Sequence, residues 1–235
     1  DNTNENDEVP MNVADPTQVF LDVVSRRRSM RDFKPDSVPR ELIESVFGNA
    51  QRAPSNCNTQ PWFVHVVTGE TLEHLRQELP AKFAAGEIAL DFPYDGQYEG
   101  VYKERQYASA AALYDSLGIA RGQKAERNAW FMRNFSFFGA PAVAFFTLPT
   151  GFGLREACDL GMFVQTVMLG LTAHGLGSCP QTALAFLANV IRPALALGDH
   201  EQLMFGMSFG YPSDTAVNEV VTERASLGDV LTFHC

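Results

Sequence analysis

The stretch REACDLGMFVQTVMLGLTAHGLG, residues 155–177, predicts a helix that is apolar on almost every side. A helix of this kind needs neighbours all round, so it lies either at the centre of a large multilayered domain or in a core that two chains share. Of these two arrangements we favour the shared core. Gly175 is placed to end the helix in the left-handed conformation that suits glycine. The stretch therefore predicts a central buried helix around which the rest of the fold is built.

Apolar residues at helical spacing predict further helices before and after this stretch. The first begins at Pro16, with Asp15 as its side-chain cap, and runs into a group of arginines. Other helices are predicted over residues 39–53, 69–80, 98–119, 121–135 and 186–195, and strands over residues 63–68, 142–148 and 202–210. We therefore expect an α+β fold in which helices flank a small central β-sheet. We expect a single domain over residues 16–235 and a mobile N-terminal segment over residues 1–15.

Composition excludes several classes of protein. The formal net charge is −10, which argues against nucleic acid as a general partner. No apolar run approaches the roughly 20 residues that a membrane-spanning helix needs, so no membrane partner is expected. The histidines are scattered, and no metal site is predicted. The cysteines show neither a C-x-x-C spacing nor a disulfide framework, which favours the reducing cytoplasm. These cysteines are Cys57, Cys158, Cys179 and Cys235.

Positive charge is nevertheless concentrated in RRRSMRDFKP, residues 26–35, which holds five of the 18 lysines and arginines. Such a run is either a solvated basic turn or a cradle for a small anion. A guanidinium group pairs with phosphate through two parallel hydrogen bonds, which makes phosphate a suitable anion. The sequence contains neither G-x-G-x-x-G nor G-x-x-x-x-G-K-[ST]. We therefore expect side chains, rather than a glycine-rich loop, to hold any phosphate.

Four motifs stand in a fixed order along the chain: RRSMRDF (27–33), PSNCNTQPW (54–62), GLGSCPQTAL (175–184) and GYPSDTAVNEVVTERASL (210–227). Together they resemble the FMN-dependent nitroreductase family, and most nearly its nitrobenzoate-reductase-like branch. The likeness covers about residues 16–230. It implies a nitroreductase-like fold, an intertwined homodimer, a bound FMN, and NAD(P)H as co-substrate.

The resemblance also implies roles for individual residues in binding the flavin. The phosphate and ribityl chain would be held by Arg27, Arg28, Ser29, Arg31 and, from the last motif, Arg224. Polar groups for the flavin's edge would come, from the other subunit, from Ser55, Asn56 and Asn58. A backbone N–H in the turn Cys179–Thr182 would meet flavin N5, with candidates Pro180, Gln181 and Thr182.

The segment around residues 94–107 is the substrate lid that the resemblance implies. Its candidates for contacting a small aromatic substrate are Tyr98, Tyr102, Lys103 and Arg105. No side chain is expected to be catalytic, because flavin N5 carries the hydride. Gln60 and Trp62 are expected to hold the loop that contains them in shape, and Cys179 is expected to be packed and inert.

These expectations predict an FMN-dependent oxidoreductase that uses NAD(P)H to reduce nitroaromatic compounds, such as nitrobenzoates. A ping-pong mechanism in two-electron steps would give the nitroso and then the hydroxylamine product. Two alternatives remain at this point. One is a flavin-dependent reductive dehalogenase or ene-reductase of the same family, and the other is a non-catalytic flavin-binding protein. Turnover of halotyrosines would favour the first, and slow reoxidation without NAD(P)H consumption the second.

Overall fold

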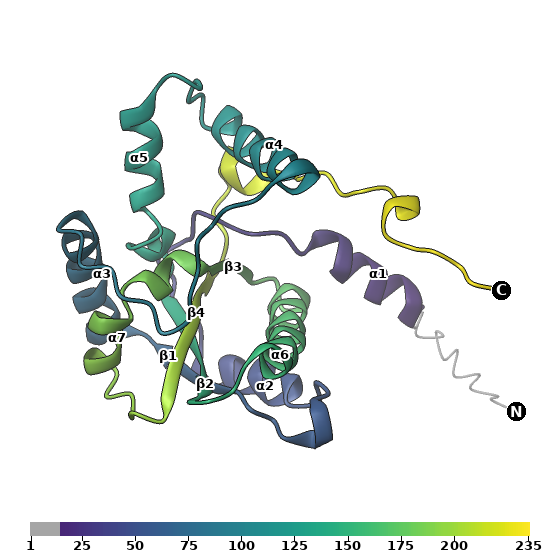
Figure 1. The fold of residues 1–235 in the computed structure, drawn as a ribbon, viewed down its shortest axis with the longest axis horizontal. Helices are drawn as coiled ribbons and strands as arrows, with labels where there is room; N and C mark the ends of the chain where they lie inside the picture. The colour runs from purple at the N-terminus through teal and green to yellow at the C-terminus, as the bar shows by residue number, and fades with distance from the viewer. Residues whose placement is uncertain (1–14) are drawn as a thin grey trace, which may run out of the picture.

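A computed structural model describes residues 15–235 of the chain (Figure 1). Its centre is a four-stranded antiparallel sheet in the order β1-β2-β4-β3. The strands are β1 (Phe63–Val67), β2 (Ala142–Pro149), β3 (Gly177–Gln181) and β4 (Glu201–Gly210). Helices pack on both faces of this sheet, which confirms the predicted α+β fold.

Strand β3 was not among the predicted strands, and the expectation of a turn over Cys179–Thr182 is wrong. Gly177–Gln181 pairs with β4, and Thr182 only then opens a short 3₁₀ helix, Thr182–Phe186. The segment contains a proline and no alternating pattern, so its local sequence does not indicate a strand. Pairing with β4, which follows 20 residues or more along the chain, imposes the extended conformation.

Every predicted helix is present among the described residues, with shifts at the ends. Thr17 N–H donates to Asp15 Oδ1 at 2.9 Å, as the predicted cap requires. The helix predicted over residues 69–80 continues through Pro80 to Ala84. The helices are α1 (Pro16–Arg26), α2 (Arg40–Ala50), α3 (Gly69–Ala84), α4 (Gly100–Ser116), α5 (Lys124–Met132), α6 (Leu154–Ala173) and α7 (Ala188–Ala194).

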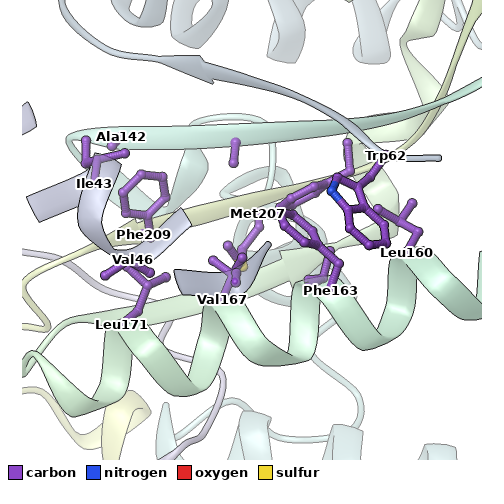
Figure 2. Close-up of a cluster of buried hydrophobic side chains, with 14 of the residues drawn as sticks. Ile43, Val46, Trp62, Ala142, Leu160, Phe163, Val167, Leu171, Met207 and Phe209 are labelled. Atoms are coloured by element: carbon purple, nitrogen blue, oxygen red, sulfur yellow. The ribbon is translucent and has the colours of Figure 1, made fainter. Parts of the chain in front are cut away.

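The core has two layers because β2 is buried on both faces. On one face, α2 and α6 cover the sheet, and Phe163 and Val167 of α6 point towards Met207 and Trp62 (Figure 2). The Trp62 ring stacks on Phe163 with ring centroids 4.7 Å apart, which confirms its expected place in the core. On the other face, α3 and α7 bury a second cluster against Phe145. The sheet is thus sandwiched between helices, as predicted.

The central helix α6 is buried on one side only within this chain. It ends as predicted, with Gly175 at φ +75°. On its other side Met162 keeps 41% of its surface exposed. Helices α1 and α4 contain no buried residue at all, and α1 exposes Val19, Phe20, Leu21 and Val24. A single chain therefore does not supply the neighbours that the apolar sequence of α6 calls for.

Two predictions about the extent of the domain remain untested. The mobile segment predicted over residues 1–15 falls largely on residues 1–14, which lie outside the described residues. The boundaries of a single domain over 16–235 also stay a prediction. Within the part that the structure covers, no helix has the length and apolarity required to cross a bilayer.

A buried polar cluster lies where β1, β2 and β4 run together. The Glu201 carboxylate is nearly buried and accepts hydrogen bonds from the Thr147 hydroxyl at 2.6 Å and from His65 Nε2 at 2.7 Å. Burial opposes ionisation of Glu201, but the bonds from Thr147 and His65 outweigh it and hold the pKa of this carboxyl below its ordinary value. Glu201 therefore stabilises the fold while it is ionised.

Replacing Thr147 with valine is expected to lower the free energy of unfolding at pH 7 by about 1.5–3 kcal/mol, the value of a hydrogen bond to a charged group. A carboxyl whose pKa is lowered by folding contributes stability above its unfolded pKa, and that contribution disappears as the pH falls through the folded value. The difference between variant and parent should therefore shrink below about pH 4. Urea unfolding at several pH values measures it, and a difference independent of pH would contradict the assignment.

Candidate functional site

The two ends of the chain meet at a cavity of about 460 Å³. The end of α1 and the segment after it form one wall, the tail after β4 forms another, and α4 and α6 complete the lining. In Figure 1 the yellow C-terminal segment passes beside α4 before it extends away from the body of the protein. All five residues predicted to hold a phosphate line this cavity: Arg27, Arg28, Ser29, Arg31 and Arg224.

Strand β3 fixes the position of the arginine-bearing segment. Met30 N–H donates to Ser178 O at 2.9 Å, so the segment lies along the outer edge of β3. The approach is so close that a Cβ on Gly177 would lie only 2.5 Å from Met30 Cγ, which explains why glycine occupies that position. On the far side, Lys34 N–H donates to Tyr211 O at 2.8 Å and joins the segment to the tail.

Positive charge in the cavity is largely uncompensated. Among the described residues, Arg28 has an ion pair, with Glu219 at 3.2 Å, while Arg27, Arg31 and Arg224 have none. The Arg28 Nε atom is buried and has no hydrogen-bond partner. Burial, and next the nearby charge of Arg224, lower the pKa of Arg27. An anion carrying two charges would neutralise this excess, so the site suits a phosphate.

Arg224 is partly committed to its own segment. Its Nη1 donates to Thr222 O at 2.9 Å, to Thr222 Oγ1 at 2.7 Å and to Glu223 O at 3.0 Å. These bonds hold the guanidinium in the lining of the cavity. Within the described residues its other two nitrogens have no protein partner and remain free to donate to a ligand.

The loop that carries Ser55, Asn56 and Asn58 lies elsewhere in the chain and does not line the arginine cavity. It sits against the first turns of α6, where Asn56 N–H donates to the buried Asp159 Oδ2 at 3.0 Å. Asn58 has φ +55°, and Gln60, at φ +47°, donates from its side chain to Asn58 O at 2.9 Å. Non-glycine residues with positive φ are held only where the surroundings over-determine them, so this loop is rigidly shaped.

The residues Pro180, Gln181 and Thr182 are also outside the arginine cavity. The Gln181 side chain is buried and fully occupied: its Nε2 donates to Asn134 O at 3.0 Å, and its Oε1 accepts from Ser208 N–H at 3.2 Å and from the Ser208 hydroxyl. Pro180 has no N–H. A backbone donor to a ligand must therefore come from Gln181 or Thr182.

The predicted substrate residues occupy the exposed start of α4 and the chain before it. Tyr102 is 65% exposed, and the Arg105 guanidinium carbon lies 5.8 Å from its ring centroid. Arg105 lines a second cavity of about 890 Å³, which shares Ser109 and Arg224 with the first. Tyr98 and Lys103 are not part of either lining. The structure therefore brings Arg105 alone of the four near the arginines.

Sequence reasoning missed four polar residues of the arginine cavity: Ser25, Ser109, Gln165 and Thr222. Gln165 could have been found, because it is a polar side chain in the middle of the apolar stretch that forms α6. Ser109 lies in an alanine-rich part of α4 and carries no comparable signal. Cys179 is buried, as expected, and burial raises the pKa of its thiol to about 11, which makes it unreactive.

Residues 24–211 match the profile described as the Nitroreductase family. The chain belongs to the nitroreductase family. Nitroreductase NfnB of Mycolicibacterium smegmatis (strain ATCC 700084 / mc(2)155) is 41% identical to this nitroreductase over 221 residues, which are 93% of this chain and 94% of that protein. The 4-nitrobenzoate reductase of Pseudomonas putida is 35% identical over 202 residues, 85% of this chain and 88% of its own length.

Solved structures of the nitroreductase family share the fold. The crystal structure of the FMN-dependent nitroreductase NfnB from Mycobacterium smegmatis in complex with NADPH superposes with a TM-score of 0.90. The two chains are 40% identical, and the match covers 94% of this nitroreductase and 100% of that chain. The resemblance inferred from the four motifs, including the likeness to nitrobenzoate reductases, is confirmed.

Proposed function

We propose that this protein is an FMN-dependent oxidoreductase that uses NAD(P)H to reduce nitroaromatic compounds, such as nitrobenzoates, in two-electron steps to nitroso and hydroxylamine products. The observation that carries the proposal is the arginine cavity, in which four guanidinium groups from both ends of the chain face a space of about 460 Å³. The relatives that match over most of the chain are nitroreductases and nitrobenzoate reductases.

The residues present fit the phosphate of FMN. Arg27, Arg28, Arg31 and Arg224 supply the charge, and Ser29 adds a hydroxyl donor. Arg27, Arg31 and Arg224 have no acidic partner among the described residues, so a phosphate would supply the negative charge that the cavity lacks. FMN, when bound, supplies the chemistry that carries a hydride from NAD(P)H to the nitro group.

The chain's own residues would bind the flavin ring system and orient it. The edge of the ring system would be met by Ser55, Asn56 and Asn58, from a loop that Asp159 and its positive-φ residues hold rigid. The strand end at Pro180, Gln181 and Thr182 would offer a backbone N–H from Gln181 or Thr182. None of these side chains needs to exchange a proton with the substrate, because water can supply protons at an open site.

We further propose that the protein is an intertwined homodimer. The loop at Ser55 lies outside the arginine cavity of its own chain, and the family resemblance implies that it meets the flavin from a second copy. The exposed apolar faces of α1 and α6 and the exposed Phe233 of the tail would be covered in the same assembly. Sedimentation equilibrium would then report twice the chain mass of 25.9 kDa, and a stable FMN-loaded monomer would contradict the proposal.

The exposed start of α4 would act as the substrate lid. Tyr98 and Tyr102 offer aromatic surface, and Lys103 and Arg105 offer positive charge to a ring carboxylate. Arg105 is the best placed, because the cavity that it lines joins the arginine cavity. We also propose a cytoplasmic location, which the spacing of the cysteines in the sequence favours.

The purified protein tests the proposed function directly. It should be yellow with bound FMN, its flavin absorption should be bleached by NADPH or NADH without oxygen, and 4-nitrobenzoate should restore it. The accumulation of the hydroxylamine product identifies the reaction. Restoration by a halotyrosine and not by 4-nitrobenzoate would support a dehalogenase instead. A colourless protein that cannot be reconstituted with FMN would end the proposal.

A further inference from the structure

The two halves of the arginine cavity come from opposite ends of the chain, and one buried side chain joins them. Asn218 is 3% exposed and lies in the tail, six residues before Arg224. Its Oδ1 accepts from the backbone N–H of Arg31, 187 residues earlier, at 2.8 Å. Its Nδ2 donates to Asp32 O at 2.7 Å and to Ser213 O at 2.9 Å. Both N–H groups and the oxygen of the Asn218 side-chain amide are therefore hydrogen-bonded.

Asp32 completes the connection from the other side. Its Oδ1 accepts from Arg133 Nη2 at 2.6 Å, which ties the segment to the end of α5. Its Oδ2 accepts from the Ser213 hydroxyl, and its backbone oxygen accepts from Ser213 N–H at 3.2 Å. The residue after Asn218, Glu219, pairs with Arg28. The tail is thus fixed to the arginine-bearing segment immediately beside the cavity.

We infer that Asn218 is a positioning residue for the phosphate of the cofactor: it sets the relative position of Arg31 and Arg28 on one wall and Arg224 on the other. Because Arg27 and Arg224 repel each other across the cavity, the two walls need connections that hold them together before the anion binds, and Asn218 is the buried one. A guanidinium group binds phosphate through paired hydrogen bonds that require a particular geometry. A shift of one wall relative to the other therefore weakens binding of the phosphate in particular. This inference rests on the proposed function.

The chemistry of an amide explains why asparagine suits this position. Aspartate could still accept from Arg31 N–H, but its carboxylate would face the oxygens of Asp32 and Ser213 without a proton to donate. Leucine has a similar size and would leave the Arg31 N–H and the Asp32 oxygen without partners. Asparagine alone among residues of this size supplies the acceptor and both donors.

The test compares two flavins that differ only in the phosphate. In apoprotein carrying Asn218→Leu or Asn218→Asp, the Kd for FMN should rise by about tenfold to hundredfold, while the Kd for riboflavin stays unchanged. At saturating FMN, kcat should remain near that of the parent, because the ring system is held elsewhere. Thr147→Val is the matched control: it breaks another buried polar bond, in the Glu201 cluster, and should leave the FMN preference intact.

An equal rise in the Kd for FMN and for riboflavin would show that the variant loosens the flavin site as a whole, and it would overturn the inference. An unchanged preference for FMN over riboflavin would overturn it as well. If neither Asn218 variant folds, Ser213→Ala removes the hydroxyl bond to Asp32 and the longer contact with the Thr215 hydroxyl at 3.4 Å. A smaller selective rise in the FMN Kd, about threefold, is then expected. An unchanged Kd in that variant would overturn the inference as well. Parent protein that binds FMN no better than riboflavin would instead contradict the proposed phosphate site itself.

Discussion

Replacing both Arg27 and Arg224 with alanine is expected to weaken FMN binding by at least about a hundredfold. Each guanidinium would form charge-assisted hydrogen bonds with the phosphate, worth about 1.5–3 kcal/mol apiece. Losing one such bond from each arginine removes about 3–6 kcal/mol, and every 1.4 kcal/mol is about a tenfold change in Kd. Titration of the apoprotein with FMN, followed by quenching of flavin fluorescence, measures the effect.

The same variant should leave the apoprotein as stable as the parent. Burial, and next the charge of Arg224, lower the pKa of Arg27, so removing both side chains takes away a buried charge and a repulsion. Arg26→Ala is the control: its guanidinium pairs with Asp22 at 2.9 Å on the surface and does not line the cavity. An equal loss of FMN affinity in Arg26→Ala would show that net charge, rather than the cavity, determines binding.

Phe163→Ala is expected to lower the free energy of unfolding by about 3–5 kcal/mol, the range for truncating a buried aromatic side chain. Phe163 is fully buried on α6, and the Trp62 ring is stacked on it (Figure 2). The Phe47 ring centroid lies 6.5 Å from that of Phe163. Alanine would leave a cavity in a core that α2, α6 and the sheet share, and these elements cannot close it without moving together. Urea unfolding of the apoprotein at one fixed chain concentration measures the loss.

Phe163→Leu provides the comparison for this prediction. Leucine keeps most of the buried apolar volume but loses the stacking on Trp62, so its destabilisation should be clearly smaller than that of alanine. If the free energy of unfolding fell by less than about 1.5 kcal/mol in both variants, Phe163 would not have the close packing that the structure assigns to it.

Local sequence was sufficient wherever the signal lay within one element. The cap at Asp15, the apolar faces of α2 and α6, and the buried strand β2 were all predicted, because periodicity and capping act over a few residues. The arginine motif was visible for a similar reason, since a dense positive run in an acidic chain is a local anomaly. The placement of Arg224 with it came from the family resemblance.

Long-range contacts explain what was missed. Strand β3 has no strand pattern of its own and is extended because β4 pairs with it. Gln181 was expected to act through its turn, whereas its side chain is occupied between Asn134 and Ser208. The loop at Asn56 was predicted as a polar connection, and its rigidity depends on the buried Asp159 of α6. None of these partners is adjacent in sequence.

The sequence by itself determined the helices, the apolar core and the surplus of arginines near one end, because each follows from side-chain chemistry within a short window. Only the tertiary structure decided that the two ends of the chain meet across one cavity, with Asn218 bonded to Arg31. It also left α1 and one side of α6 without a partner in the chain. The physical reason is that these contacts join residues far apart along the chain. They leave no periodic pattern in the local sequence, and only the packing of the whole chain determines them.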